Sequence, residues 1–131
     1  MKANKLMIGD WVYSPEGELC KVRMIEGRFE GFVTTDNYAH DDDTFYMYYI
    51  EEIRPIPLTA EILEKNGFEK CEIPEIEYIG WRLNEKFSLE VSPASTNDID
   101  GLYWNDDVHI RYVHQLQHVL RLCRIDKEIE L

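Results

Sequence analysis

The chain has 131 residues, of which 44% are hydrophobic and 31% are charged, a composition typical of one globular domain or of two small ones. Its 26 acidic and 14 basic residues leave a net charge of −12 at pH 7. A field of that sign repels phosphate backbones, which argues against nucleic acid as a partner and favours a basic protein partner or simple solubility.

Residues 6–57 predict a series of short strands. Four runs are predicted as strands from their composition and their alternation with a period of two. They cover residues 11–13, 19–26, 28–35 and the aromatic run 45–50. Within 19–26 the alternation places Cys20, Val22 and Met24 on one side. A tight turn and a short final strand are expected over 51–56. Five short strands in this stretch predict a small SH3-like β-barrel.

The period changes after residue 57. Thr59 is a good N-cap and Asn66-Gly67 supplies a left-handed exit, so we predict a short helix over 59–66 with Phe68 folding back on its last turn. Segment 69–75, which is charged and contains proline, predicts no strand. Further strands are expected over 76–84, 86–92, 102–105 and 108–112, a second helix over 112–122, and an edge strand or tail over 127–131.

The predicted fold class is therefore α+β. An N-terminal SH3-like small β-barrel over residues 1–57 is followed by a small α+β part over residues 58–131, with two short helices and a few antiparallel strands, packed against the barrel.

Three segments of the chain resemble a known family. They are IGDWVY at 8–13, PIPLTAEILEKNGFEK at 55–70, and YVHQLQ at 112–117 followed by KEIEL at 127–131. In order and spacing they are similar to a family of small proteins, without an assigned activity, from Bacteroidetes-type bacteria and their phages and mobile elements. The resemblance spans essentially the whole chain, and it carries no list of catalytic residues to transfer. It also implies asparagine at the position of His118 in many members.

Two histidines, His114 and His118, have the four-residue spacing used by zinc-binding helices. A protease-type site has glutamate directly after the first histidine, where this chain has Gln115. Helical spacing of apolar residues explains the segment as a packing helix with the histidines on its flank. That stripe consists of Val113, Leu116, Leu120 and Cys123. A metal-dependent hydrolase using His114 and His118 stays open as an alternative, and His40 in HDDD is a weaker metal candidate.

Aromatic residues are dense in the first strand and in the run over 45–50. Strand alternation buries either Phe45, Met47 and Tyr49 or Tyr46 and Tyr48, and leaves the other set for a partner. In an SH3-like barrel such residues can dock a proline-rich or otherwise extended peptide, and acidic neighbours would select a basic one. We assign the binding face to Trp11, Tyr13, Tyr38, Tyr46 and Tyr48.

The remaining patterns indicate a binding protein and not an enzyme. No nucleophile elbow or phosphate-cradling loop is present, no cofactor is expected, and Cys20, Cys71 and Cys123 look like reduced, partly buried thiols. Without an apolar run of signal-peptide or membrane-span length, a cytoplasmic location is expected. We predict a protein-interaction protein of a phage or mobile element, and the sequence does not indicate its oligomeric state. A further alternative is an acidic DNA mimic that blocks a host DNA-binding protein.

Overall fold

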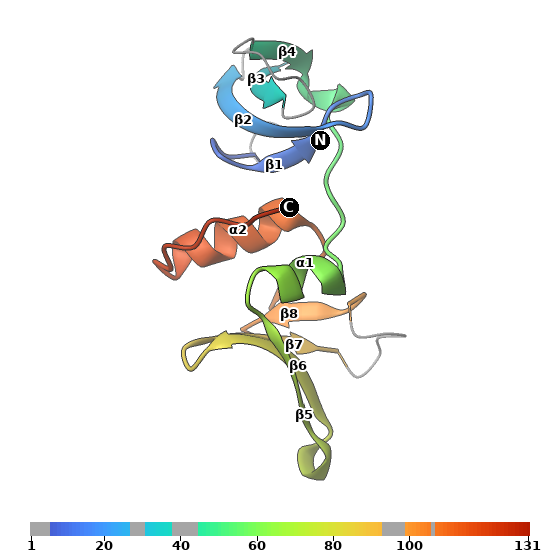
Figure 1. The fold of residues 1–131 in the computed structure, drawn as a ribbon, viewed down its shortest axis with the longest axis vertical. Coiled ribbons are helices and arrows are strands. Elements are labelled where there is room, and N and C mark those ends of the chain that lie inside the picture. Colours follow the sequence, from blue (N-terminus) through green and yellow to red (C-terminus); the bar gives the residue numbers. More distant parts are fainter. Residues whose placement is uncertain (1–5, 27–30, 38–44, 93–98, 106) are drawn as a thin grey trace. The chain divides into compact units, whose positions relative to one another are not determined.

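The structure is a computed structural model that describes residues 6–26, 31–37, 45–92, 99–105 and 107–131. The chain divides into two units, residues 1–56 and 57–131, and each contains one antiparallel sheet (Figure 1). The α+β class predicted from the sequence is confirmed. Across the described ranges, no helix has the length and apolar character that a membrane crossing requires.

The sheet of the first unit contains four strands in the order β1-β2-β3-β4, each antiparallel to the next. They are β1 (Trp11–Tyr13), β2 (Leu19–Glu26), β3 (Phe32–Asn37) and β4 (Phe45–Tyr49). A one-turn 3-10 helix, η2 (Ile50–Glu52), takes the place of the expected tight turn. The expected fifth strand is reduced to a single bridge between Arg54 and Tyr13. The described residues form no closed barrel.

A β-bulge in β2 decides which of its side chains face the core. The pairing register with β3 shifts between Val22 and Met24, which reverses the alternation at that point. Met24 is therefore exposed and Ile25 packs against the core, so the predicted placement of Met24 beside Val22 is wrong. The core that they flank consists of Leu6, Val12, Cys20, Val22, Val33, Ile50 and Ile53.

The sheet of the second unit contains five antiparallel strands in the order β5-β6-β7-β8-β9. They are β5 (Glu69–Ile73), β6 (Tyr78–Asn84), β7 (Phe87–Val91), β8 (Leu102–Trp104) and β9 (Val108–Ile110), with the one-turn helix η3 (Pro74–Ile76) between β5 and β6. The sequence predicted no strand at β5. Its side chains are mostly exposed, so the strand lacks apolar alternation and is held by pairing with β6.

The helices of the second unit, α1 (Ala60–Lys65) and α2 (Val113–Leu122), lie on one side of its sheet (Figure 1). The predicted start of α1 is confirmed, since the Thr59 side chain accepts a hydrogen bond from the N–H of Ile62 at 3.2 Å. Its end is confirmed too. Gly67 has a φ of 87°, and the N–H of Phe68 donates to the carbonyl of Leu63 at 3.0 Å.

Asn66, at the end of α1, connects two distant parts of the second unit. Its buried side chain donates a hydrogen bond from Nδ2 to the carbonyl of Glu130 at 2.8 Å. The N–H of Glu130 donates back to Oδ1 at 2.7 Å. Because the two residues are 64 positions apart, this side chain fixes the C-terminal tail against α1 much as a neighbouring strand would. Ile129 beside it is buried.

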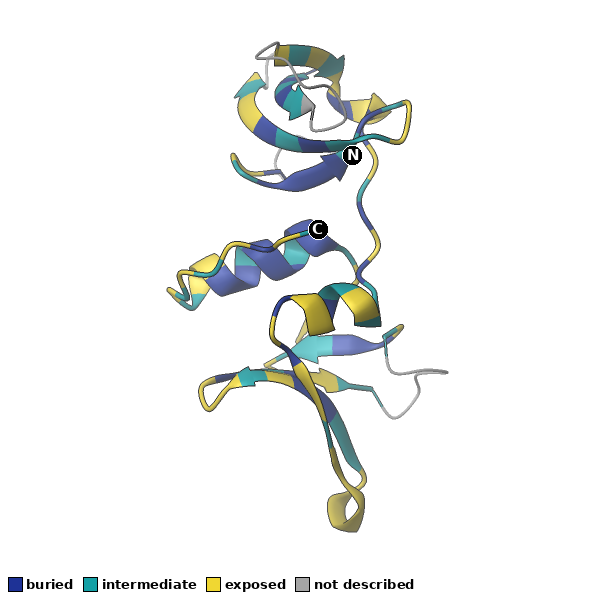
Figure 2. Ribbon diagram, viewed as in Figure 1, coloured by how far each residue is buried: buried dark blue, intermediate teal, exposed yellow. Residues whose placement is uncertain are grey.

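Helix α2 contains the packing stripe that the sequence predicted. Val113, Leu116 and Leu120 are each almost fully buried, and much of α2 is coloured as buried in Figure 2. Cys123 lies just past the helix at its C-cap and is half-buried. The three helical members of the stripe are therefore confirmed as core residues.

Candidate functional site

The outer side of the first sheet carries a group of exposed apolar side chains. Met24 pairs across β2 and β3 with Thr34, and Thr34 pairs with Met47 on β4, so the two methionines lie in one row of the sheet. The rings of Phe32 and Tyr49 lie in another row, with their centroids 4.7 Å apart. We define the outer apolar face as Met24 (62% exposed), Phe32, Phe45 (62%), Met47 (68%) and Tyr49 (41%).

The alternation along β4 explains why these residues are outside. Tyr46 pairs with Thr35 and Tyr48 pairs with Val33, and both partners are fully buried. Paired residues share a side of the sheet, so Tyr46 and Tyr48 face inward, and Tyr48 packs against the core. The sequence left open which set of β4 is buried. Tyr46 and Tyr48, which we assigned to a binding face, are half-buried on the inner side of the sheet, and ligand binding by them stays a prediction.

Of the other residues assigned to a binding face, the structure describes Trp11 and Tyr13, and neither of them is exposed. Trp11 is buried, and the Lys21 ammonium lies 4.9 Å from its ring centroid. Tyr13 is half-buried and exchanges two backbone hydrogen bonds with Arg54. Tyr38 lies outside the described residues. Ligand binding by this set stays a prediction.

Strand β4 is an edge strand of the described sheet. The N–H of Ile50 donates to the carbonyl of Gly31 at 3.2 Å. Because hydrogen-bonded positions alternate along an antiparallel strand, the backbone groups of the even-numbered residues of β4 are the ones that bond to β3. The backbone N–H and C=O groups of Phe45 and Met47 consequently point away from β3. Tyr49, the next odd position, donates its N–H to the Glu52 carboxylate at 3.2 Å. Two residues of the outer apolar face therefore present backbone groups that can pair with another strand.

Carboxylates surround the outer apolar face. Glu26 is exposed and pairs with Phe32 in the same row of the sheet. Glu51 and Glu52 follow β4 directly and are exposed. The charge of Asp36 is balanced, since the Arg23 guanidinium donates to its carboxylate. Lys21 pairs with Asp36 in the same row as Phe45. Among the described residues the four carboxylates at or next to the face outnumber the two cations, Lys21 and Arg23, and this excess favours a cationic ligand.

The two histidines on α2 are packed against neighbouring aromatic rings. His114 is buried, although the sequence placed it on the flank, and its ring stacks on Tyr112 with centroids 5.9 Å apart and 9° between planes. His118 is half-buried and meets His114 edge to face at 5.6 Å. Among residues that the structure describes, no group of three or more His, Cys, Asp or Glu side chains could hold a metal ion. His40 lies outside those residues.

Gln115 has a structural role at the position where a zinc protease carries its glutamate. Its side-chain oxygen accepts hydrogen bonds from the N–H of Arg111 at 2.7 Å and from the N–H of Tyr112 at 3.0 Å. Both N–H groups lie at the start of α2, where backbone donors lack partners within the helix. The string YVHQ thus encodes a helix start.

The second unit also has an open pocket of about 370 Å³ that the sequence did not indicate. Its lining combines apolar side chains with a carboxylate, a guanidinium and a phenol. It is formed by Pro57, Leu58, Ile99, Asp100, Arg111 and Tyr112. These residues come from three separate segments, so no local pattern announces the pocket.

The three cysteines are free thiols, with Cys20 buried and Cys71 and Cys123 half-buried, which confirms their predicted burial. Burial raises the pKa of the Cys20 thiol above its ordinary value. Its Sγ atom lies 3.5 Å from the carbonyl of Glu18, to which it donates. A protonated thiol inside the core is a poor nucleophile, so Cys20 is a packing residue.

Comparison with known proteins adds no relative. No protein-family model, no curated protein and no solved structure matches the chain. The resemblance to the family from Bacteroidetes-type bacteria and their mobile elements therefore stays a prediction, and the candidate site is defined by the geometry of β2, β3 and β4.

Proposed function

We propose that this protein is a non-enzymatic, cytoplasmic accessory protein of a phage or mobile element, and that it binds an extended, basic segment of another protein along β4. The observation that carries the proposal is the edge position of β4 in the described sheet combined with the outer apolar face. Backbone groups at the edge supply affinity for any extended strand, and the side chains of the face supply selectivity for apolar residues.

The composition of β4 supports this use of the edge. Natural edge strands are usually protected from unwanted pairing by charged residues, proline or bulges. The β4 sequence FYMYY contains neither a charged residue nor proline, and two of its exposed side chains, Phe45 and Met47, are large and apolar. An edge left open in this way is a suitable site for strand addition. The flexible thioethers of Met24 and Met47 allow the face to adapt to different apolar side chains.

Charge favours a basic partner over a second copy of the chain. The first unit contains six basic and eleven acidic residues, and Glu51 and Glu52 are exposed immediately after β4. Two copies pairing through β4 would bring these like charges together, which opposes association. A segment with lysine or arginine beside its apolar residues would instead gain from the same field.

We also propose that the first unit is a small SH3-like barrel. The support is the return of the chain after η2, where Tyr13 donates to the carbonyl of Arg54 at 2.9 Å and Arg54 donates back at 3.1 Å. This contact brings the last segment of the unit to β1, the strand it would have to join in a closed barrel.

The proposed function can be tested with a phage-displayed library of random 12-residue peptides. We expect selection on the full chain to enrich extended peptides that alternate apolar residues and carry Lys or Arg. The double variant Phe45→Ser, Met47→Ser removes two exposed side chains of the face. It should weaken these peptides about thirtyfold, from the loss of about 2 kcal/mol of apolar burial.

The matched control is Leu122→Ser, which removes an exposed apolar residue at the end of α2 and should leave affinity unchanged. Far-ultraviolet circular dichroism and the thermal midpoint should be the same for all variants, because the replaced side chains are exposed. The proposal is contradicted if no peptide is enriched, or if the enriched peptides bind the double variant as tightly as the unmodified chain.

A further inference from the structure

The β5–β6 hairpin forms an arm that projects from the second unit (Figure 1). Strand β6 pairs with β7 only from Gly80 onward, whereas its pairing with β5 continues to Tyr78, opposite Ile73. Residues 72–79 therefore form a two-stranded ribbon that is closed by η3, and no residue of η3 is buried. We refer to residues 69–79, which comprise this ribbon and its base in the sheet, as the arm.

The base of the arm is fixed by close packing. A Cβ atom at Gly80 would lie 2.5 Å from the phenol oxygen of Tyr78 and 2.8 Å from the backbone carbonyl of Leu89. The Tyr78 side chain therefore occupies the space above Gly80, a device that stabilises strands at glycine positions. The arm leaves the sheet in a defined direction, which reduces the entropy lost when its tip binds.

The tip of the arm is apolar without having a core to join. Ile73 is 44% exposed and Ile76 is 68% exposed, and Pro74 between them is also exposed. Branched apolar side chains at the end of a two-stranded ribbon gain no stability from burial within this unit. Exposed apolar groups rimmed by polar residues are characteristic of protein contact sites.

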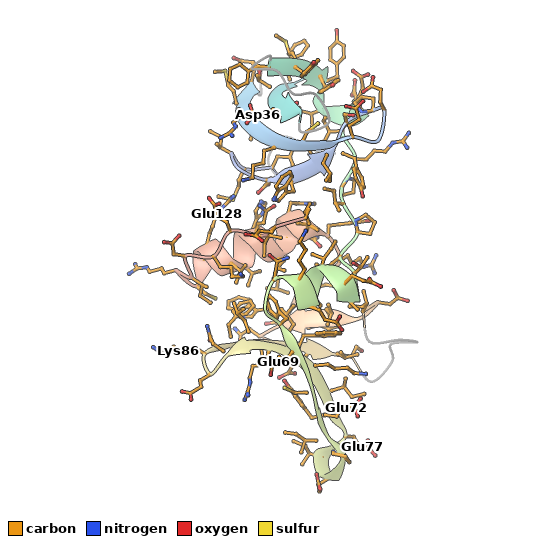
Figure 3. All side chains as sticks on the ribbon, viewed as in Figure 1. Asp36, Glu69, Glu72, Glu77, Lys86 and Glu128 are labelled. Atoms are coloured by element: carbon orange, nitrogen blue, oxygen red, sulfur yellow. The ribbon has the colours of Figure 1, made fainter. Side chains whose placement is uncertain are left out.

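Negative charge flanks this tip. The arm contains four glutamates and one lysine, and the lysine is already engaged, since Lys70 Nζ lies 3.1 Å from a carboxylate oxygen of Glu72. Glu72 and Glu77 lie on the arm away from both helices (Figure 3). Glu75 lies in η3 beside the isoleucines. A second copy would meet the same charges, so a basic partner is favoured.

We propose that the arm is a second docking element, which inserts Ile73 and Ile76 into an apolar depression rimmed by Lys and Arg on a basic protein. Together with the outer apolar face, it makes the chain bivalent, with one contact site on each unit. This inference does not depend on strand addition at β4, because the two sites use different residues, different units and different modes of contact.

The test uses the same peptide library with the full chain as bait. We expect a second class of enriched peptides, which are short and basic and have a central apolar residue. Their affinity for the variant Ile76→Ser should be at least about tenfold lower than for the unmodified chain, and their affinity for the double variant Ile73→Ser, Ile76→Ser should be lower still. This class should bind Phe45→Ser, Met47→Ser normally. Replacing Glu72, Glu75 and Glu77 by Gln should slow association about tenfold at low salt and flatten its salt dependence.

The charge control changes three exposed glutamates elsewhere in the same unit, Glu61→Gln, Glu64→Gln and Glu128→Gln, and should leave association unchanged. Ile76 lies outside the strands, so Ile76→Ser should keep the thermal midpoint. The inference is overturned if every enriched peptide binds the arm variants normally. It is also overturned if the chain forms dimers in sedimentation experiments that Ile76→Ser abolishes, because the occupant would then be a second copy.

Discussion

In the second unit the apolar side of the sheet is covered by its own chain, whereas in the first unit an apolar side of the sheet is open. Phe87 on β7 is buried, and its ring meets Phe68, just after α1, at 6.1 Å. Phe45 on β4 is 62% exposed, and η2, the only helical element in the described part of its unit, is one turn long. Two phenylalanines on strands thus have opposite environments.

This difference separates residues that stabilise the fold from residues available for binding. Burial of an aromatic side chain removes its apolar surface from water during folding. The same surface on Phe45 and Met47 remains in water until a partner covers it. Substitutions in the two sheets should therefore give opposite patterns, with large effects on stability in one and large effects on binding in the other.

The largest expected effect on stability is that of Phe87→Ala. Because Phe87 is almost fully buried, the substitution should lower the free energy of unfolding by about 3–5 kcal/mol. Phe45→Ala should change it by less than about 0.5 kcal/mol. Urea unfolding followed by circular dichroism measures both. Equal losses for the two variants would show that the outer side of the first sheet is not open in solution.

A smaller effect is expected when the polar connection inside the second unit is removed. Asn66→Ala deletes both hydrogen bonds to the backbone of Glu130 and a third, from Nδ2 to the carbonyl of Ile62, and at about 1 kcal/mol for each bond the two bonds to Glu130 account for about 2 kcal/mol of the loss. Glu64→Ala, an exposed change in the same helix, should be nearly neutral. A loss no greater than that of Glu64→Ala would mean that the tail is not held by Asn66.

The smallest expected effect is a dependence on alkaline pH through Cys20. Its pKa in the folded protein is raised by burial above the ordinary value of 9.0, so above pH 9 the unfolded thiol loses its proton before the folded one does. The stability that this thiol contributes is present below pH 9 and is lost as the pH rises toward its folded pKa. Urea midpoints from pH 7.5 to 10 should fall more steeply for the unmodified chain than for Cys20→Ala. Parallel curves would contradict the assigned burial effect.

Much of the fold could be predicted because its signals are local. Thr59 and Gly67 mark the ends of α1, and the apolar spacing of Val113, Leu116 and Leu120 marks α2. Strand β5 could not be predicted, since its pairing partners lie across the hairpin and its own side chains are mostly exposed. The bulge after Val22 was also hidden, because an extra residue in a strand leaves the composition of that strand unchanged.

The candidate site was predictable only in part. The sequence indicated that one of two sets of β4 side chains would be open, but it did not say which set. That choice depends on the pairing of Tyr46 with Thr35, which joins residues of different strands. The arm had no sequence signal, because the exposure of Ile73 and Ile76 follows from where the β6–β7 pairing ends.

The most direct test of strand addition at β4 is amide hydrogen exchange by NMR, with and without a peptide that was selected on the full chain and is weakened by Phe45→Ser, Met47→Ser. Our account predicts that the amide protons of Phe45 and Met47 exchange rapidly in the free protein and at least about tenfold more slowly in the complex, because each becomes bonded to the added strand. Tyr46 and Tyr48 should be protected in both states. The account is contradicted if the peptide binds while Phe45 and Met47 continue to exchange at their free rates.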